Sequence, residues 1–163
     1  MFDDRMLNLA RLVLDECRSR RLKVATAESC TGGLIAGLLT EIPGSSDVVE
    51  RGFIVYSNRA KEELLGVPGD LIADHGAVSE PVARLMAEGA LAESRANLAV
   101  AVTGVAGPGG GTALKPVGLV HIAVARENKP ILHQAMRFGD IGRSEIRRET
   151  IMEALEMCRR MIG

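Results

Sequence analysis

The chain has few aromatic residues: its 163 residues include one tyrosine, three phenylalanines and no tryptophan. Proteins that bind single-stranded nucleic acid stack bases on aromatic side chains, so this scarcity argues against that function. The 20 lysines and arginines nearly balance the 21 aspartates and glutamates, which gives a net charge of −1. Such a surface lacks the basic excess that attracts nucleic acid or an anionic membrane. We therefore expect neither nucleic acid nor a membrane as a partner.

Patterns typical of metal sites and membrane spans are missing as well. The three cysteines, Cys17, Cys30 and Cys158, form no CxxC pair, and the three histidines are widely spaced, which predicts no metal site. No apolar run approaches the roughly 20 residues of a transmembrane helix. The acidic pair Asp3 and Asp4 near the start of the chain is unlike a signal peptide. These absences predict a reduced, cytoplasmic protein.

The composition that remains is that of a globular protein, 47% hydrophobic and 25% charged. Helical periodicity alternates with apolar runs typical of strands. We predict helices over residues 3–20, 31–41, 58–65, 69–74, 79–94 and 144–161, and strands over 23–27, 48–57, 97–103, 117–126 and 131–138. Asp3 or Asp4, Asn58 and Ser79 are the expected N-caps. This order predicts an α/β fold, a three-layer α/β/α sandwich with a mixed β-sheet that forms a single domain over residues 1–163.

The run AESCTGG at residues 27–33 lies between two apolar segments and predicts a strand, a tight turn and a helix. Strand ends that lead into helix N-termini are common places to bind an anion or stabilise an oxyanion. Ser29 is therefore a candidate nucleophile. The alternative is that Ser29 and Thr31 only cap the helix. We expect Glu28 to hold the turn and Cys30 to be a buried, unreactive thiol.

The run YSNRAK at residues 56–61 carries a second candidate group. Lys61 is predicted in the first turn of a helix, where the partial positive charge of the helix N-terminus disfavours a cation. Such a position, like burial, lowers the pKa of a lysine, and a neutral lysine can act as a general base. The alternative is that Lys61 is a solvated surface residue.

A glycine-rich run follows the predicted strand over residues 97–103. Glycines there allow the backbone to approach a ligand closely and to point several N–H groups into one concavity, which suits a phosphate. The pattern matches neither a Walker motif nor a GxGxxG motif, because a strand follows it. A plain flexible loop is the alternative. Arg143 and Arg147, one helical turn apart, are candidate phosphate ligands.

Several long blocks of the chain together resemble the CinA C-terminal domain family, the nicotinamide-nucleotide amidases. They extend from about Leu22 to the final helix, and their order makes them far more specific than any single block. Family members often have Gly-Asp-Arg at one corner, whereas Ile141 and Gly142 separate Asp140 from Arg143 here. The blocks are AESCTGG at 27–33, VYSNRAKEELLGV at 55–67, HGAVSEPVARLMAEGA at 75–90, VTGVAGPGGGTALKPVG at 102–118 and the corner at 139–143.

The resemblance implies hydrolysis of the carboxamide of nicotinamide mononucleotide to nicotinic acid mononucleotide and ammonia, in pyridine-nucleotide salvage, without a metal or cofactor. It implies that Ser29 attacks the amide carbon, that Lys61 is the base with Tyr56 as its relay or orienting group, and that Thr103 is catalytic. We further expect a homo-oligomer, a dimer. The residues that we expect to bind substrate are Glu28, Cys30, Thr31, Gly32, Gly33, Asn58, Gly104, Ala106, Gly107, Gly109, Gly110 and Arg143.

Two other functions stay open at this point. The chain is alternatively a non-catalytic module that binds a nucleotide or a protein in a competence-related role, or an amidase for another small amide. Fold resemblance alone does not establish chemistry. Many family members also carry a larger N-terminal domain that resembles molybdopterin-cofactor proteins and is linked to nucleotide pyrophosphatase activity. The resemblance here covers only the C-terminal domain, so that activity is not carried over.

Overall fold

The computed structural model describes residues 1–163 and contains six α-helices, one short 3-10 helix and five strands. The helices are α1 (Asp4–Ser19), α2 (Leu34–Glu41), α3 (Asn58–Leu65), α4 (Gly69–His75), α5 (Glu80–Ala92) and α6 (Arg143–Ile162), and the 3-10 helix is η1 (Ser45–Asp47). The strands are β1 (Val24–Glu28), β2 (Val49–Ile54), β3 (Leu98–Gly104), β4 (Leu119–Arg126) and β5 (Leu132–Arg137).

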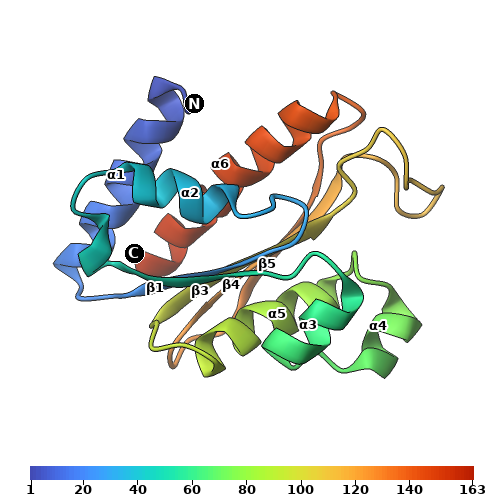
Figure 1. Ribbon diagram of the computed structural model, residues 1–163, viewed down its shortest axis with the longest axis horizontal. Helices are drawn as coiled ribbons and strands as arrows, with labels where there is room; N and C mark the ends of the chain where they lie inside the picture. The colour runs from blue at the N-terminus through green and yellow to red at the C-terminus, as the bar shows by residue number, and fades with distance from the viewer.

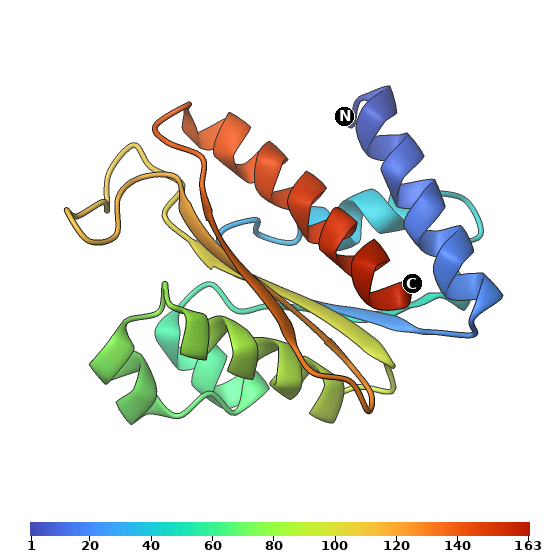
Figure 2. The same cartoon turned by 180° about the vertical axis from the view of Figure 1, so that it is seen from behind.

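The five strands form one mixed sheet in the order β2-β1-β3-β4-β5. Strand β1 runs parallel to both β2 and β3, whereas β3 and β5 pair antiparallel with β4. Helices α1, α2 and α6 cover one face of the sheet, and α3, α4 and α5 cover the other (Figure 1). Figure 2 shows the same two helix layers, one on each face of the sheet, from behind. The predicted three-layer α/β/α sandwich is thus confirmed. No helix combines the length and hydrophobicity that crossing a bilayer requires.

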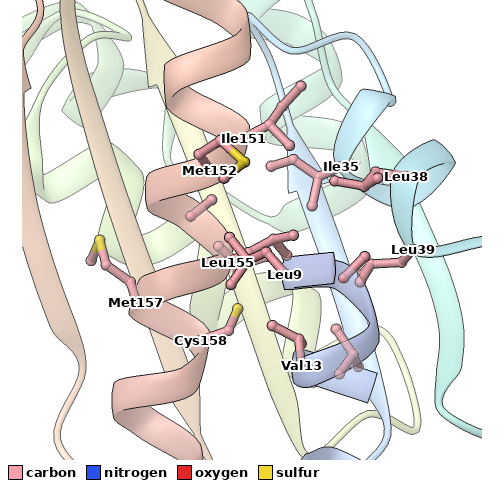
Figure 3. Close-up of a cluster of buried hydrophobic side chains, with 14 of the residues drawn as sticks. Leu9, Val13, Ile35, Leu38, Leu39, Ile151, Met152, Leu155, Met157 and Cys158 are labelled. Atoms are coloured by element: carbon pink, nitrogen blue, oxygen red, sulfur yellow. The ribbon is translucent and has the colours of Figure 1, made fainter. Parts of the chain in front are cut away.

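The largest hydrophobic cluster fills the space between the sheet and the layer of α1, α2 and α6 (Figure 3). Val13 of α1, Leu38 of α2 and Leu155 of α6 are almost completely buried there. Each side chain of this size contributes roughly 1.5–3 kcal/mol when it leaves water. The opposite face is lined largely by alanines of β1, β3 and β4, which lets α5 pack close to the sheet.

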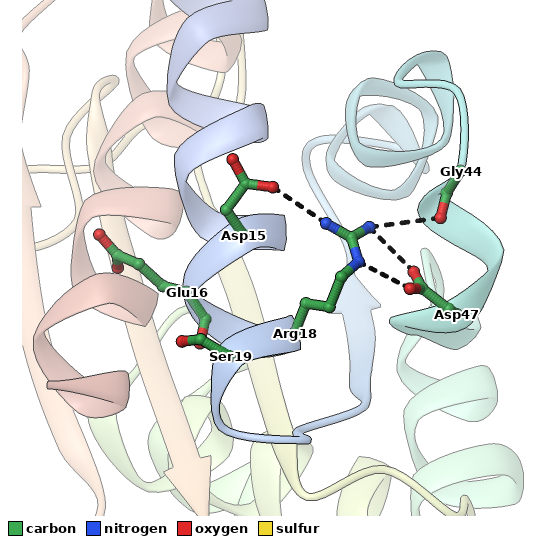
Figure 4. Close-up of polar contacts among 6 residues, drawn as sticks. All are labelled: Asp15, Glu16, Arg18, Ser19, Gly44 and Asp47. Carbon is green, nitrogen blue, oxygen red and sulfur yellow. Dashed lines mark hydrogen bonds and ion pairs between the residues drawn. The ribbon is translucent and has the colours of Figure 1, made fainter.

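A polar contact ties α1 to the segment that precedes β2 (Figure 4). Arg18 donates through Nε to Asp47 at 2.6 Å and through Nη1 to Asp15 at 2.9 Å. Its Nη2 also donates to the Gly44 carbonyl at 3.3 Å. These groups are largely exposed, so each ion pair contributes at most about 1 kcal/mol.

Several predicted element ends differ from the structure. Helix α2 begins at Leu34, not at residue 31, because Gly32 and Gly33 have φ angles of +60° and +100°, which are not helical. Strand β2 ends at Ile54, whereas the predicted strand ran to residue 57. Tyr56 therefore lies in the connection to α3 and not in the sheet.

The predicted N-caps have mixed outcomes. Asp3 caps α1 as expected, because its Oδ1 accepts from the Met6 N–H at 2.8 Å. Ser57, not Asn58, caps α3, since its Oγ accepts from the Ala60 N–H at 3.0 Å. Ser79 precedes α5, but its hydroxyl donates to the Gly76 carbonyl and does not accept from the helix.

The topology brings three strand ends together. Strand β1 lies between its parallel neighbours β2 and β3, and the connections to them pass over opposite faces of the sheet. In open α/β sheets, ligands bind outside the carboxyl ends of the strands at such a switch point. Here Ser29 follows β1, Tyr56 follows β2, and Thr103 lies near the end of β3.

Candidate active site

A cavity of about 250 Å³ lies at this switch point. The turn after β1, the start of α3, the end of β3 and the start of α6 contribute to its wall. The lining contains the guanidinium of Arg143 and no carboxylate, which favours an anionic ligand. The lining residues are Ser29, Cys30, Tyr56, Asn58, Lys61, Ala77, Val78, Thr103, Gly104, Ala106 and Arg143. A larger hollow, of about 480 Å³ between α1 and α6, contains no comparable group of nucleophile and base.

Lys61 reaches the nucleophile candidate from α3. Its side chain is buried, with 1% exposure, and its Nζ lies 2.9 Å from Ser29 Oγ. Nζ also donates to the backbone carbonyls of Val55 at 2.9 Å and Tyr56 at 3.3 Å. Lys61 takes part in no ion pair. The alternative of a solvated surface lysine is therefore wrong.

Burial acts in opposite directions on the two titratable neighbours of Ser29. It lowers the pKa of Lys61, because removal from water disfavours the ammonium form. It raises the pKa of the Cys30 thiol to about 12, because the thiolate is the disfavoured form there. The thiol is thus largely protonated at neutral pH and, unlike Ser29 Oγ, forms no hydrogen bond with Lys61 Nζ, which favours the expected unreactive role of Cys30.

Glu28 anchors the turn that carries Ser29. Its side chain is completely buried, and its carboxylate accepts from the Thr31 hydroxyl at 2.5 Å. The same carboxylate accepts from the N–H groups of Ile35 at 2.9 Å and Ala36 at 3.0 Å. These N–H groups belong to the first turn of α2, where the backbone offers no acceptor. Glu28 thus caps α2 from outside the helix, and the alternative that Ser29 and Thr31 only cap it is wrong.

Two amides of the same turn donate to no backbone carbonyl. They belong to Cys30, which is 6% exposed, and to Thr31, which is fully buried. The neighbouring amides are paired: Ser29 N–H donates to the Val102 carbonyl, and Gly32 N–H donates to the Ser29 carbonyl. Buried amides are nearly always hydrogen-bonded, and of these two residues only Cys30 lines the cavity, so its N–H is the donor placed to meet an anionic oxygen beside Ser29.

Arg147 of α6 holds the other side of this turn. Its Nε donates to the Cys30 carbonyl at 3.1 Å, and its Nη2 donates to the Thr31 carbonyl at 3.3 Å. Of the two arginines considered for phosphate binding, Arg147 therefore bonds the protein backbone, whereas Arg143 lines the cavity.

Arg143 connects three parts of the cavity rim. It donates to the Gly107 carbonyl at 2.6 Å and to the Tyr56 hydroxyl at 3.3 Å. The Tyr56 side chain is 63% exposed, and only its backbone carbonyl contacts Lys61. Tyr56 therefore meets Lys61 through the backbone and not through the hydroxyl that we expected to relay a proton. The Thr103 hydroxyl is buried and donates to the Ala77 carbonyl at 3.0 Å.

The structure brings together most, but not all, of the expected site residues. The predicted catalytic residues Ser29, Tyr56, Lys61 and Thr103 all line the cavity, and Ala77 and Val78 are lining residues that we did not predict. Both lie in the block at 75–90 that carried the resemblance, but neither has a polar side chain that would have marked it as a site residue. The expected binding residues that do not line the cavity are Glu28, Thr31, Gly32, Gly33, Gly107, Gly109 and Gly110.

Curated relatives match almost the whole chain but are much longer. A CinA-like protein of Mycobacterium sp. (strain JLS) is 53% identical over 140 residues, which cover 85% of this chain and 33% of that protein. A CinA-like protein of Anaeromyxobacter sp. (strain Fw109-5) is 46% identical over 159 residues, 98% of this chain and 38% of that protein. The chain spans about a third of the length of the curated relatives that it matches.

Solved structures match along their full length. The competence/damage inducible protein CihA from Agrobacterium tumefaciens is 55% identical, with a TM-score of 0.98 over 100% of this chain and 99% of that one. A competence-damaged protein (CinA) superfamily protein from Escherichia coli is 28% identical, with a TM-score of 0.91 over 99% and 94% of the two chains. The family model for the CinA C-terminal domain matches residues 6–162. The chain therefore belongs to the CinA C-terminal domain family.

Proposed function

We propose that the protein is an amidohydrolase that converts nicotinamide mononucleotide to nicotinic acid mononucleotide and ammonia, with Ser29 as nucleophile and Lys61 as base. One observation carries the proposal: Nζ of the buried Lys61 lies 2.9 Å from Ser29 Oγ. Burial lowers the pKa of Lys61 and so favours the neutral amine, which has two N–H donors and one lone pair. In that form the carbonyls of Val55 and Tyr56 accept from the two N–H donors, and the lone pair accepts the Ser29 proton.

In the first half of the reaction, Ser29 Oγ attacks the carboxamide carbon and its proton passes to Lys61 Nζ. The oxygen of the tetrahedral intermediate accepts from the N–H group of Cys30, which lines the cavity and donates to no backbone carbonyl. One such donor typically contributes about 2.7–4 kcal/mol to the transition state. Lys61 then returns the proton to the amide nitrogen, so that ammonia leaves and an acyl-enzyme forms.

In the second half, water replaces ammonia. Lys61 takes a proton from the water molecule as its oxygen attacks the acyl carbon, and Ser29 leaves with that proton to regenerate the hydroxyl. Thr103 fixes the cavity wall through its bond to the Ala77 carbonyl. Arg143, supported by Tyr56 and Gly107, is positioned at the rim to meet the 5′-phosphate.

Ammonia release from three amides tests this proposal. Wild type and Ser29→Ala are compared on nicotinamide mononucleotide, free nicotinamide and glutamine. We expect wild-type activity on the mononucleotide and a loss of about 10³-fold or more in kcat for Ser29→Ala. Preference for an amide without phosphate would favour another substrate, and no activity on any amide would favour a binding module. Near wild-type activity of Ser29→Ala would exclude the covalent serine mechanism.

A further inference from the structure

Beyond the groups that contact substrate, the turn at Ser29 depends on a residue more than a hundred positions away. We propose that Arg147 is a positioning residue: it holds the peptide planes of the turn so that the N–H group of Cys30 faces the oxyanion. The proposal rests on the proposed function, because it assumes that an oxyanion forms at this turn.

The first step of the argument is the geometry of a peptide unit. A trans peptide is planar, and its C=O and N–H point in opposite directions. The Thr31 carbonyl, which accepts from Arg147 Nη2 at 3.3 Å, shares one such unit with the Gly32 N–H, and that N–H donates to the Ser29 carbonyl at 3.1 Å. The Ser29 carbonyl shares the preceding unit with the Cys30 N–H. Arg147 is thus linked through two successive peptide units to the N–H of Cys30, a residue that lines the cavity.

The second step is that two bonds fix orientation where one would not. The fork of a guanidinium is rigid, and Arg147 uses Nε and Nη2 on the successive carbonyls of Cys30 and Thr31. The guanidinium also lies against Gly32, where an added Cβ would be 3.2 Å from Nη2. The turn is thus clamped between Arg147 on one side and the carboxylate of Glu28 on the other.

The third step is electrostatic. A cation at a carbonyl oxygen draws electron density along the peptide and makes the N–H of the same unit a stronger donor. Arg147 is half-buried, so water screens this effect only in part. Its charge therefore supports an oxyanion without touching the substrate, and its contribution grows as negative charge develops on the reacting oxygen.

The test compares Arg147→Met with Arg148→Met, a matched change at the next position of α6, where the side chain pairs with Asp3 at the surface. For hydrolysis of the mononucleotide, we expect Arg147→Met to lower kcat by about 10- to 100-fold and to change KM by less than about threefold, because oxyanion donors act in the transition state. Arg148→Met should keep wild-type kcat. Arg147→Lys keeps the positive charge but lacks the planar guanidinium that bonds two carbonyls at once, so its kcat should lie between those of Arg147→Met and wild type.

A second measurement does not depend on the natural substrate. An uncharged alkyl fluorophosphonate labels an activated serine: the Ser29 Oγ–P bond forms, the P–F bond breaks, fluoride leaves and Lys61 takes the hydroxyl proton. Mass spectrometry of the intact protein follows the rate, with Ser29→Ala as the blank. We expect labelling to slow at least about tenfold in Arg147→Met and to stay unchanged in Arg148→Met.

The outcomes separate this inference from the proposed function. A wild type that is labelled but releases no ammonia from the mononucleotide would overturn the proposed substrate and leave the role of Arg147 to be decided by labelling alone. Equal labelling rates and equal kcat in Arg147→Met and wild type would overturn the role of Arg147. If Arg147→Met fails to fold, as thermal melting would reveal, Arg147→Lys decides: wild-type rates in that variant would contradict the need for a fork.

Discussion

The nucleophile turn (residues 28–33) and the glycine-rich loop (residues 104–118) both follow parallel strands at the same edge of the sheet, but they are held very differently. The nucleophile turn is fixed from three elements, through Glu28 to α2, Arg147 to α6 and Lys61 to α3. The tip of the glycine-rich loop, residues 108–114, is exposed at every position and extends beyond the body of the fold (Figure 1).

The loop is attached at its base and not at its tip. Lys115 donates to the His75 carbonyl, and Arg143 donates to that of Gly107. The end of the site that carries Ser29 and Lys61 is thus held by contacts to several elements, whereas the glycine-rich loop beside the end that we assign to the phosphate is exposed at its tip. This difference predicts which parameter a substitution should change. Substitutions near the turn should alter kcat and stability, and substitutions at the phosphate end should alter KM.

Removal of the base should give the largest effect on the turn. Lys61→Met keeps the volume but cannot accept the Ser29 proton, so we expect kcat to fall by about 10³-fold or more with a small change in KM. The exposed Lys129→Met is the control and should retain wild-type kcat. A loss of less than tenfold in Lys61→Met would mean that another group activates Ser29.

The pH dependence follows from the lowered pKa of Lys61. Only the neutral amine accepts a proton, so wild-type kcat/KM should rise with pH and reach its plateau below the ordinary lysine pKa of 10.5. Between the folded and unfolded pKa values, the unfolded state binds more protons, so stability contributed by this group rises with pH. The difference in melting temperature between wild type and Lys61→Met should therefore change in favour of wild type as pH increases toward 10.5.

The sequence predicts strand β1, the turn that follows it and the position of Ser29 in that turn, because these depend on local apolar runs and glycines. It does not predict the cap of α2, since local rules look for a side chain next to the helix and Glu28 lies six residues before its first residue. Nor does it predict that Lys61 is buried. Lys61 is 32 residues from Ser29, and only the packing of α3 against the sheet brings the two together.

The phosphate end was harder to predict for a related reason. Arg143 and Arg147 are equivalent by spacing, one turn apart on α6, and the sequence left both as candidates. The difference between them arises not from a local motif but from the position of α6 over the sheet, which directs Arg147 to the Cys30 carbonyl and Arg143 to the cavity rim.

Loss of the Glu28 charge should have an intermediate effect, mainly on stability. In Glu28→Gln one acceptor oxygen becomes an NH₂ group that faces the donors of Thr31, Ile35 or Ala36. A buried donor without an acceptor costs about 1–3 kcal/mol, which lowers the melting temperature by several degrees in a chain of this size. Glu41→Gln, at the exposed end of the same helix, should change stability by less than about 0.5 kcal/mol. Equal melting temperatures for the two variants would contradict the anchoring role.

The smallest effect should come from the phosphate end of the site, at Arg143. Arg143 is exposed and contacts no part of the nucleophile turn, so Arg143→Met should raise KM for nicotinamide mononucleotide by about tenfold and leave kcat within about twofold. For nicotinamide riboside, which lacks the phosphate, the variant and wild type should have the same KM. Arg160→Met, at the far end of α6, should match wild type on both substrates. A fall in kcat on the riboside would show that Arg143 contributes to the chemical step. The division between a turn that determines kcat and a phosphate end that determines KM would then be wrong.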